Sequence, residues 1–194
     1  MTQDRRTPAE RTPPGQYLTR DWPVLHYGNV PRVNPETWRF RVFGLVEQEL
    51  ELTLSQFRSL PVTRVHCDIH CVTQWSRLDN DFEGVLFKDL LTQVKVRPEA
   101  KYVLLHAEGG WTTNVPLADL LRDDVLFAWR WNGQEITPEH GWPLRTVVPH
   151  LYFWKSAKWV RGMELVAEDR PGFWERNGYH MYGNPWTEER FSDD

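Results

Sequence analysis

The sequence predicts an α+β domain with a mixed, β-rich core and short helices, and two observations lead to this prediction. Runs of branched and aromatic residues, some of them alternating with polar ones, recur along the chain as expected for strands. Turn signals rich in Gly, Pro and Asn separate these runs and leave room only for short helices. The 194 residues suffice for one domain with a sizeable core.

The pattern places the elements in order along the chain. The predicted strands cover residues 37–46, 51–54, 63–66, 101–107, 111–116, 125–131 and 160–167. The predicted short helices cover residues 54–60, 87–94 and 117–122. Ser55 is the expected cap of the first helix, and Gly84 is expected to form a turn before the second. Asn132-Gly133 predicts a tight turn.

The two ends of the chain differ from its middle. Residues 1–19 are polar and rich in Pro and Thr, which predicts a flexible N-terminal arm. Residues 20–194 are expected to form a single domain that ends in an aromatic, turn-rich C-terminal arm.

Charge and hydropathy narrow the possible partners and location. A net charge of −4 and a pI near 6.0 give no support for binding to nucleic acid or a membrane surface. No run approaches the roughly 18 apolar residues of a membrane helix, and the N-terminus lacks the apolar stretch of an export signal. We therefore expect a cytoplasmic protein.

The segment 64–77, RVHCDIHCVTQWSR, holds the residues most suited to binding a metal. Two cysteines, Cys67 and Cys71, alternate with His66 and His70, and thiolates and imidazoles are good metal ligands. A small zinc site built from Cys67, His70 and Cys71 is one interpretation. Four ligands from so short a segment would be strained, and no second ligand pair occurs elsewhere in the sequence. The other interpretation needs one protein ligand, with a cofactor supplying the rest.

The run CVTQWS, Cys71 to Ser76, resembles the metal-ligand motif of the sulfite oxidase-like molybdopterin oxidoreductases. This family includes the eukaryotic sulfite oxidases and the catalytic subunit of the bacterial periplasmic methionine-sulfoxide reductase. Matching segments recur in the family's order from about Trp22 to Tyr182. The resemblance implies the family's molybdopterin-binding fold, a molybdenum–molybdopterin cofactor, and Cys71 as the only protein ligand of the metal.

Two further segments are similar to the family's cofactor-binding loops. In the irregular loop 21–31, the resemblance implies that His26 and Tyr27 contact the cofactor, although His26 could equally be a solvated loop residue. The run 138–149 resembles the family's His-Gly-x-Pro-x-Arg segment. It implies that His140 and Arg145 face the cofactor and its phosphate, with a surface cation as the alternative for Arg145.

The last two matches lie toward the C-terminus. The run 153–160 is similar to the loop that wraps the pterin. It implies backbone contacts from Ser156 and Ala157 and an ammonium from Lys158, which could instead be an exposed lysine. Trp174 and Tyr179 keep the family's spacing of five. Tyr179 is therefore a candidate catalytic residue, unless it only packs the C-terminal arm.

The resemblance implies oxygen-atom transfer on a small S-oxo or N-oxo substrate, as in sulfite oxidation or sulfoxide reduction. Leu25 matches the position at which the loop of the sulfite oxidases carries an arginine, so the reduction of an S-oxide or N-oxide fits the less cationic pocket at least as well as sulfite oxidation. The cofactor carries the redox chemistry, and a separate electron-transfer partner is expected. The alternatives are a non-catalytic cofactor-binding relative and the small zinc protein.

Overall fold

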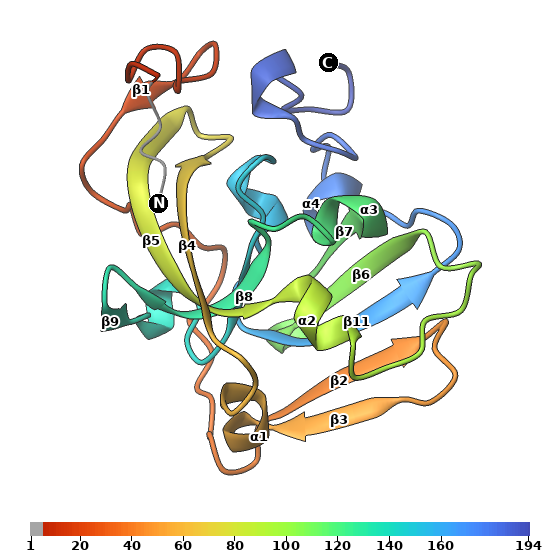
Figure 1. Ribbon diagram of the computed structural model, residues 1–194. Helices are drawn as coiled ribbons and strands as arrows, with labels where there is room; N and C mark the ends of the chain where they lie inside the picture. The colour runs from red at the N-terminus through yellow and green to blue at the C-terminus, as the bar shows by residue number, and fades with distance from the viewer. Residues whose placement is uncertain (1–5) are drawn as a thin grey trace.

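Two β-sheets and four short α-helices make up the computed structural model, which describes residues 6–194 (Figure 1). The first sheet contains β1 (Tyr17–Leu18), β4 (Thr63–His70), β5 (Trp75–Leu86), β8 (Leu126–Trp131), β9 (Gln134–Glu135) and β10 (Arg145–Val147). The second contains β2 (Arg39–Gly44), β3 (Leu50–Thr53), β6 (Tyr102–Ala107), β7 (Thr112–Pro116) and β11 (Val160–Val166). The helices are α1 (Leu54–Arg58), α2 (Phe87–Leu91), α3 (Leu117–Leu120) and α4 (Phe173–Arg176). This architecture confirms the predicted α+β class. No helix within these residues is long and apolar enough to cross a bilayer.

The topology brings the Cys71 segment to the end of a long hairpin. The second sheet has the order β3-β2-β11-β6-β7, in which β11 is parallel to β2 and antiparallel to β6. In the first sheet β1, β5, β8 and β10 lie side by side, while β4 pairs with β5 and β9 with β8. The antiparallel β4–β5 pair extends away from the second sheet (Figure 1), and residues 71–74 form its turn.

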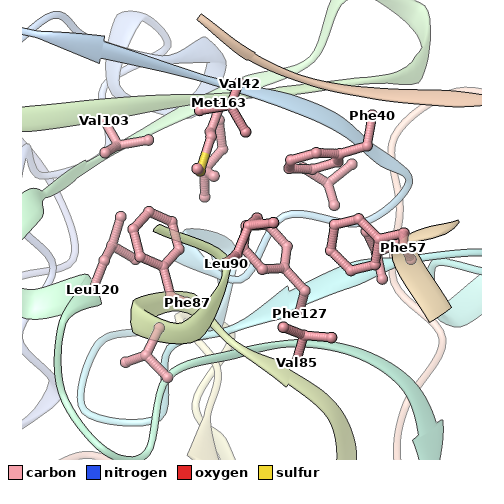
Figure 2. Packing of buried hydrophobic residues seen from close by; sticks show 14 of the residues in the cluster. Phe40, Val42, Phe57, Val85, Phe87, Leu90, Val103, Leu120, Phe127 and Met163 are labelled. Carbon is pink, nitrogen blue, oxygen red and sulfur yellow. The ribbon is translucent and has the colours of Figure 1, made fainter. Parts of the chain in front are cut away.

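The main hydrophobic core fills the space between the two sheets. Figure 2 shows Phe40 and Met163 of the second sheet pointing toward Phe127 of the first. The ring of Phe127 stacks on Phe87 of α2 at 5.5 Å and meets the edge of Phe40 at 5.1 Å. Each of these side chains is almost fully buried, which stabilises the fold by about 1.5–3 kcal/mol apiece. This packing fixes the two sheets relative to each other.

The structure corrects two local predictions. Gly84 does not form a turn, because β5 continues through it to Leu86. A Cβ atom at Gly84 would lie 1.8 Å from the carbonyl oxygen of Phe127, so glycine is needed there for the close approach of β8. The cap of α1 is Thr53 and not Ser55. The Thr53 hydroxyl accepts from the Gln56 amide, and the Gln56 side chain accepts from the Thr53 amide, which makes a capping box.

The expected N-terminal arm is also corrected where the structure describes it. Residues 1–5 lie outside the described part, but residues 6–19 follow the surface of the domain. Strand β1 pairs in parallel with β5 at Trp75 and Ser76. Arg11 is only 9% exposed and forms ion pairs with Asp68 at 2.5 Å and Asp79 at 2.6 Å. The polar composition suggested disorder, yet the contacts that hold this segment are themselves polar.

The contact at Gly84 gives a stability test. We expect Gly84→Ala to lower the free energy of unfolding in urea by roughly 1–3 kcal/mol or more, because the new methyl group forces β5 and β8 apart. Gly133→Ala is the control, since Gly133 has a φ of +78° but no atom within 4 Å of an added Cβ. Gly133→Ala should lower the free energy of unfolding by only about 1 kcal/mol. Equal losses in the two variants would contradict the steric argument.

Candidate active site

A cavity of about 330 Å³ lies where the β4–β5 turn, the loop 22–27, the segment 153–159 and the C-terminal arm meet. Its volume is within the range of small-molecule sites. The cavity is lined by eight of the nine residues predicted to form the site, namely Cys71, Tyr179, His26, Tyr27, Arg145, Ser156, Ala157 and Lys158. The fold therefore brings together the segments that the sequence analysis selected, although they are far apart in the chain.

Cys71 occupies the first position of the hairpin turn. Its amide donates to the carbonyl of Trp75 at 2.9 Å, and its own carbonyl accepts from Gln74, whose φ is +72°. The Cys71 sulfur accepts a hydrogen bond from the Thr73 hydroxyl at 3.1 Å. Burial raises the pKa of the Cys71 thiol, whereas the Thr73 hydroxyl and the Lys158 ammonium act in the opposite direction. Cys71 is thus a free thiol with partners that favour its thiolate form.

Both ends of the chain hold this turn in place. The Gln16 side-chain amide donates to the carbonyl of Cys71 at 3.0 Å and to that of Trp75 at 3.2 Å. Arg190, only 8% exposed, donates to the carbonyl of Val72 at 2.9 Å. Sequence reasoning missed both residues, because each lies in a polar terminal segment that resembles a solvated arm. No local pattern marks a side chain whose partner is a distant main-chain carbonyl.

Arg145 lies inside the molecule at 1% exposure, so the surface-cation alternative is wrong. Its Nη1 donates to the carbonyl of His140 at 2.7 Å and its Nη2 to that of Ser156 at 3.0 Å. The guanidinium also lies over the rings of Phe153, at 4.4 Å, and Trp22, at 5.0 Å. Main-chain carbonyls and aromatic faces therefore surround this cation.

No carboxylate in residues 6–194 forms an ion pair with Arg145. Burial alone lowers the pKa of Arg145 to about 9. The Nε of Arg145 donates a third hydrogen bond, to the Thr146 carbonyl at 3.3 Å. Together with the bonds to His140 and Ser156, three of the five N–H groups of the guanidinium are engaged. Two donors and a full positive charge remain for an anionic group in the cavity.

Lys158 provides a second cation at the same cavity. Its Nζ donates to the carbonyl of Leu25 at 2.6 Å and to that of Glu139 at 2.7 Å, which leaves one of its three N–H groups. Burial and the charge of Arg145 lower the pKa of Lys158 to about 7. Throughout the described chain no carboxylate pairs with it either. Two neighbouring cations without counterions indicate a site for an anion.

His140 lies behind the cavity wall and is absent from its lining. Its Nε2 donates to the carbonyl of Trp22 at 3.1 Å, and its Nδ1 then accepts from the Thr137 hydroxyl at 3.1 Å. The imidazole packs against the Trp22 ring with centroids 4.1 Å apart. Because both ring nitrogens have protein partners, His140 supports Trp22 and Arg145 in this arrangement and does not face the cavity.

Tyr179 belongs to an aromatic wall of the same cavity, which it forms with Trp154 and Trp174. Its ring stacks on Trp174, with centroids 5.0 Å apart and planes 18° apart, and meets the edge of Trp154 at 5.0 Å. Burial and the nearby Cys71 sulfur raise the pKa of Tyr179, and no described residue hydrogen-bonds to its hydroxyl. The spacing of five residues between Trp174 and Tyr179 therefore brings both rings to the cavity, with a phenol free to bind a ligand.

A buried ion pair anchors this wall and was not predicted. Lys155 and Glu175 are joined at 2.6 Å, and both side chains are at most 1% exposed. The same carboxylate oxygen of Glu175 accepts from the indole of Trp154 at 2.9 Å. Lys155 also donates to the Asn114 side chain at 2.8 Å, which ties α4 to β7. In the sequence both charges look like ordinary surface residues.

The remaining predicted residues, His26, Tyr27, Ser156 and Ala157, also line the cavity. The Ser156 hydroxyl accepts from the Val148 amide at 2.9 Å, and the Ala157 carbonyl accepts from Thr146. His26 is exposed, and its Nδ1 lies 3.0 Å from the Gly28 carbonyl oxygen. Tyr27 is 65% exposed.

Trp111, which the sequence analysis did not select for the site, has its ring 5.9 Å from Tyr27 and also lines the cavity.

The arrangement does not suit a closed zinc site. Within the described residues, no group of three or more His, Cys, Asp or Glu side chains is placed to hold a metal ion. The His70 Nδ1 is 2.8 Å from the Ser76 hydroxyl in a buried pair. Cys67 packs against a second, smaller hydrophobic cluster that includes Val65, Ile69 and Phe82, where burial raises the pKa of its thiol.

The cavity fits an anionic ligand with many hydrogen-bond acceptors. The buried indole Nε1 of Trp75 and the buried hydroxyl of Thr112 have no partner within residues 6–194, and both residues line the cavity. Buried polar groups are almost always satisfied in native proteins. Together with the spare donors of Arg145 and Lys158, they are suited to a phosphate-bearing heterocycle.

The chain matches the model of the oxidoreductase molybdopterin-binding domain family over residues 27–174, and it belongs to this family. Membership confirms the predicted family, the enzyme class and the molybdopterin cofactor. The donor set of the cavity is consistent with that cofactor.

Known relatives support the same class. The chain is 52% identical to the uncharacterized oxidoreductase YuiH of Bacillus subtilis, over 95% of this chain and 93% of that protein. It is 28% identical to YedZ1 of Azospira oryzae, provisionally named a protein-methionine-sulfoxide reductase subunit, over 88% of this chain and 66% of that protein. The structure of the sulfane dehydrogenase SoxCD from Paracoccus pantotrophus superposes with a TM-score of 0.69 at 23% identity. The match covers 79% of this chain and 43% of that one. This likeness confirms the predicted fold.

The hold of Arg190 on the Cys71 turn can be tested by mutation. We expect Arg190→Met to destabilise the protein by roughly 1.5–3 kcal/mol, because the hydrogen bonds from the charged guanidinium to the carbonyls of Val72 and Pro14 are lost. Molybdenum content per chain should fall with it, since the turn loses its fixed shape. Arg176→Met is the matched control, because Arg176 is exposed and its side chain, among the described residues, bonds only to the carbonyl of Pro171. Unchanged metal content in Arg190→Met would contradict this assignment.

Proposed function

We propose that the protein is an oxygen-atom-transfer enzyme that reduces a neutral organic S-oxide or N-oxide, with Cys71 as the only protein ligand of molybdenum. The observation that carries the proposal is the presence, in one cavity, of the free Cys71 thiol and two cations, Arg145 and Lys158, that have no carboxylate partner among residues 6–194. A thiolate is a suitable ligand for a transition metal. The cations suit the phosphate of the pterin.

The residues of the cavity divide the remaining work. Arg145 and Lys158 hold the anionic end of the cofactor, and Trp75 and Thr112 offer donors to its ring system. When bound, the cofactor supplies two-electron oxygen-atom transfer. The free hydroxyl of Tyr179 donates a hydrogen bond to the oxygen of the substrate. The aromatic wall that surrounds Tyr179 limits the access of water.

Three features favour a neutral substrate over sulfite. Leu25 lines the cavity at the position where the resembling loop of the sulfite oxidases has an arginine. Main-chain carbonyls engage part of the donors of Arg145 and Lys158, and in this proposal the anionic end of the cofactor takes the others, so they are not available to a dianionic substrate. The lining includes the rings of Tyr27 and Trp111, and aromatic rings suit the apolar substituents of an organic substrate. The name of YedZ1 points in the same direction.

The reaction consumes electrons and protons that must be supplied from outside. An S-oxide, two electrons and two protons give the thioether and one water molecule. The electrons come from a separate carrier, in accordance with the expectation from the sequence. The S=O bond of the substrate breaks, and its oxygen leaves as water.

The role of Cys71 is tested by replacing each cysteine in turn. We expect Cys71→Ser to abolish turnover with a reduced viologen dye as the electron donor, while circular dichroism remains unchanged. Cys67→Ala is the control, because Cys67 packs in the smaller hydrophobic cluster away from the cavity lining. It should retain most of the activity. Normal turnover in Cys71→Ser would exclude the assignment.

The substrate class is tested by comparing rates on a panel. With the same dye, dialkyl and aryl-methyl sulfoxides and tertiary amine N-oxides should give kcat/KM at least tenfold above that for sulfite oxidation with an oxidised dye. Leu25→Arg should lower the ratio of kcat/KM for sulfoxides to kcat/KM for sulfite, because it adds a cation to the cavity lining. Faster sulfite oxidation in the unmodified protein would reverse the proposed preference.

A further inference from the structure

Thr73 follows Cys71 by two positions and had no role in the sequence analysis. Its hydroxyl lies 3.1 Å from the Cys71 sulfur and is the only side-chain donor to that sulfur in the described part of the chain. Thr73 also lines the cavity. A hydroxyl that donates to a free thiol is already placed to donate to the thiolate that binds a metal.

The main chain fixes this contact. The Cys71 amide bonds to Trp75, the Gln74 amide bonds to Cys71, and Gln74 adopts a φ of +72°, so the turn has one well-defined shape. Arg190 holds the carbonyl of Val72, which lies between the two partners. The branched side chain of Thr73 has few rotamers, which keeps its hydroxyl directed at the sulfur.

We propose that Thr73 is a positioning residue that tunes the metal by donating a hydrogen bond to the Cys71 thiolate. Such a bond withdraws electron density from the sulfur and so weakens its donation to the metal. Partners of this kind orient metal ligands and adjust reduction potentials in other metal sites. The bond therefore raises the reduction potential of the bound molybdenum and makes the reduced enzyme easier to form. This inference rests on the proposed coordination by Cys71.

The test compares three holoenzymes, namely the unmodified protein, Thr73→Val and Thr73→Ser. Valine has nearly the shape of threonine but no hydroxyl, whereas serine keeps the donor. Each is titrated with a redox dye while the molybdenum(V) signal is followed by electron paramagnetic resonance. Only molecules that contain metal give this signal, so incomplete loading does not affect the midpoint potential. We expect Thr73→Val to shift the midpoint to a more negative potential and Thr73→Ser to remain near the unmodified protein.

Two results would overturn the inference. One is the same midpoint potential and the same signal in Thr73→Val as in the unmodified protein. The other is an equal shift in Thr73→Ser, which would mean that packing and not the hydroxyl matters.

X-ray absorption at the molybdenum edge tests the coordination by Cys71 separately from the role of Thr73. Loss of one sulfur ligand in Cys71→Ser establishes the coordination on its own. If Cys71→Ser loses no sulfur ligand, the coordination by Cys71 and the role of Thr73 both fall. If the sulfur ligand is lost but Thr73→Val leaves the potential unchanged, only the tuning role falls.

Discussion

The cavity depends on one electrostatic constraint, the guanidinium of Arg145, which is held inside the molecule without a carboxylate partner in the described part of the chain. Transferring an isolated charge from water to a protein interior is costly. Arg145 offsets part of that cost through the carbonyls of His140 and Ser156 and through the faces of Trp22 and Phe153. To supply those carbonyls, the segments on either side of β10 must curl toward the same point. The positive charge that remains is a driving force for binding an anionic cofactor.

The architecture around this cation follows from how the sheets meet. The large core locks the two sheets together on one side, as Figure 2 shows. The β4–β5 hairpin then extends beyond that core and carries Cys71 at its tip. A projecting turn is mobile unless something holds it, and here Gln16 and Arg190 do so from the two ends of the chain. The terminal segments are therefore part of the site and not appendages to it.

Much of the site could be predicted from the sequence, and what could not has a physical explanation. Cys71, Arg145, Lys158 and Tyr179 were found because short motifs of a known family surround them, and they line one cavity. Seven strands were recognised by their hydrophobic pattern, but the longest, β5, was not, because polar residues make up much of its sequence. The helix-to-strand boundaries and the roles of particular glycines were not, since the requirement at Gly84 comes from the carbonyl of a strand more than forty residues away. Gln16, Arg190 and Glu175 were missed for a similar reason, because polar side chains whose partners are distant in the chain look like surface residues.

The presence or absence of a carboxylate partner distinguishes the cations that have a structural role from those that are suited to bind a ligand. Lys155 is as buried as Arg145, but the carboxylate of Glu175 neutralises it at 2.6 Å, and the pair joins the elements behind the aromatic wall. Breaking such a pair is costly, so its contribution is to hold the wall in one arrangement. Arg145 and Lys158 lack any such partner in the described structure, and both border the cavity. Lys155, whose role is structural, has a carboxylate partner, whereas the buried Arg145 and the half-buried Lys158 have none within residues 6–194, which is why we propose that their counterion is the anionic cofactor.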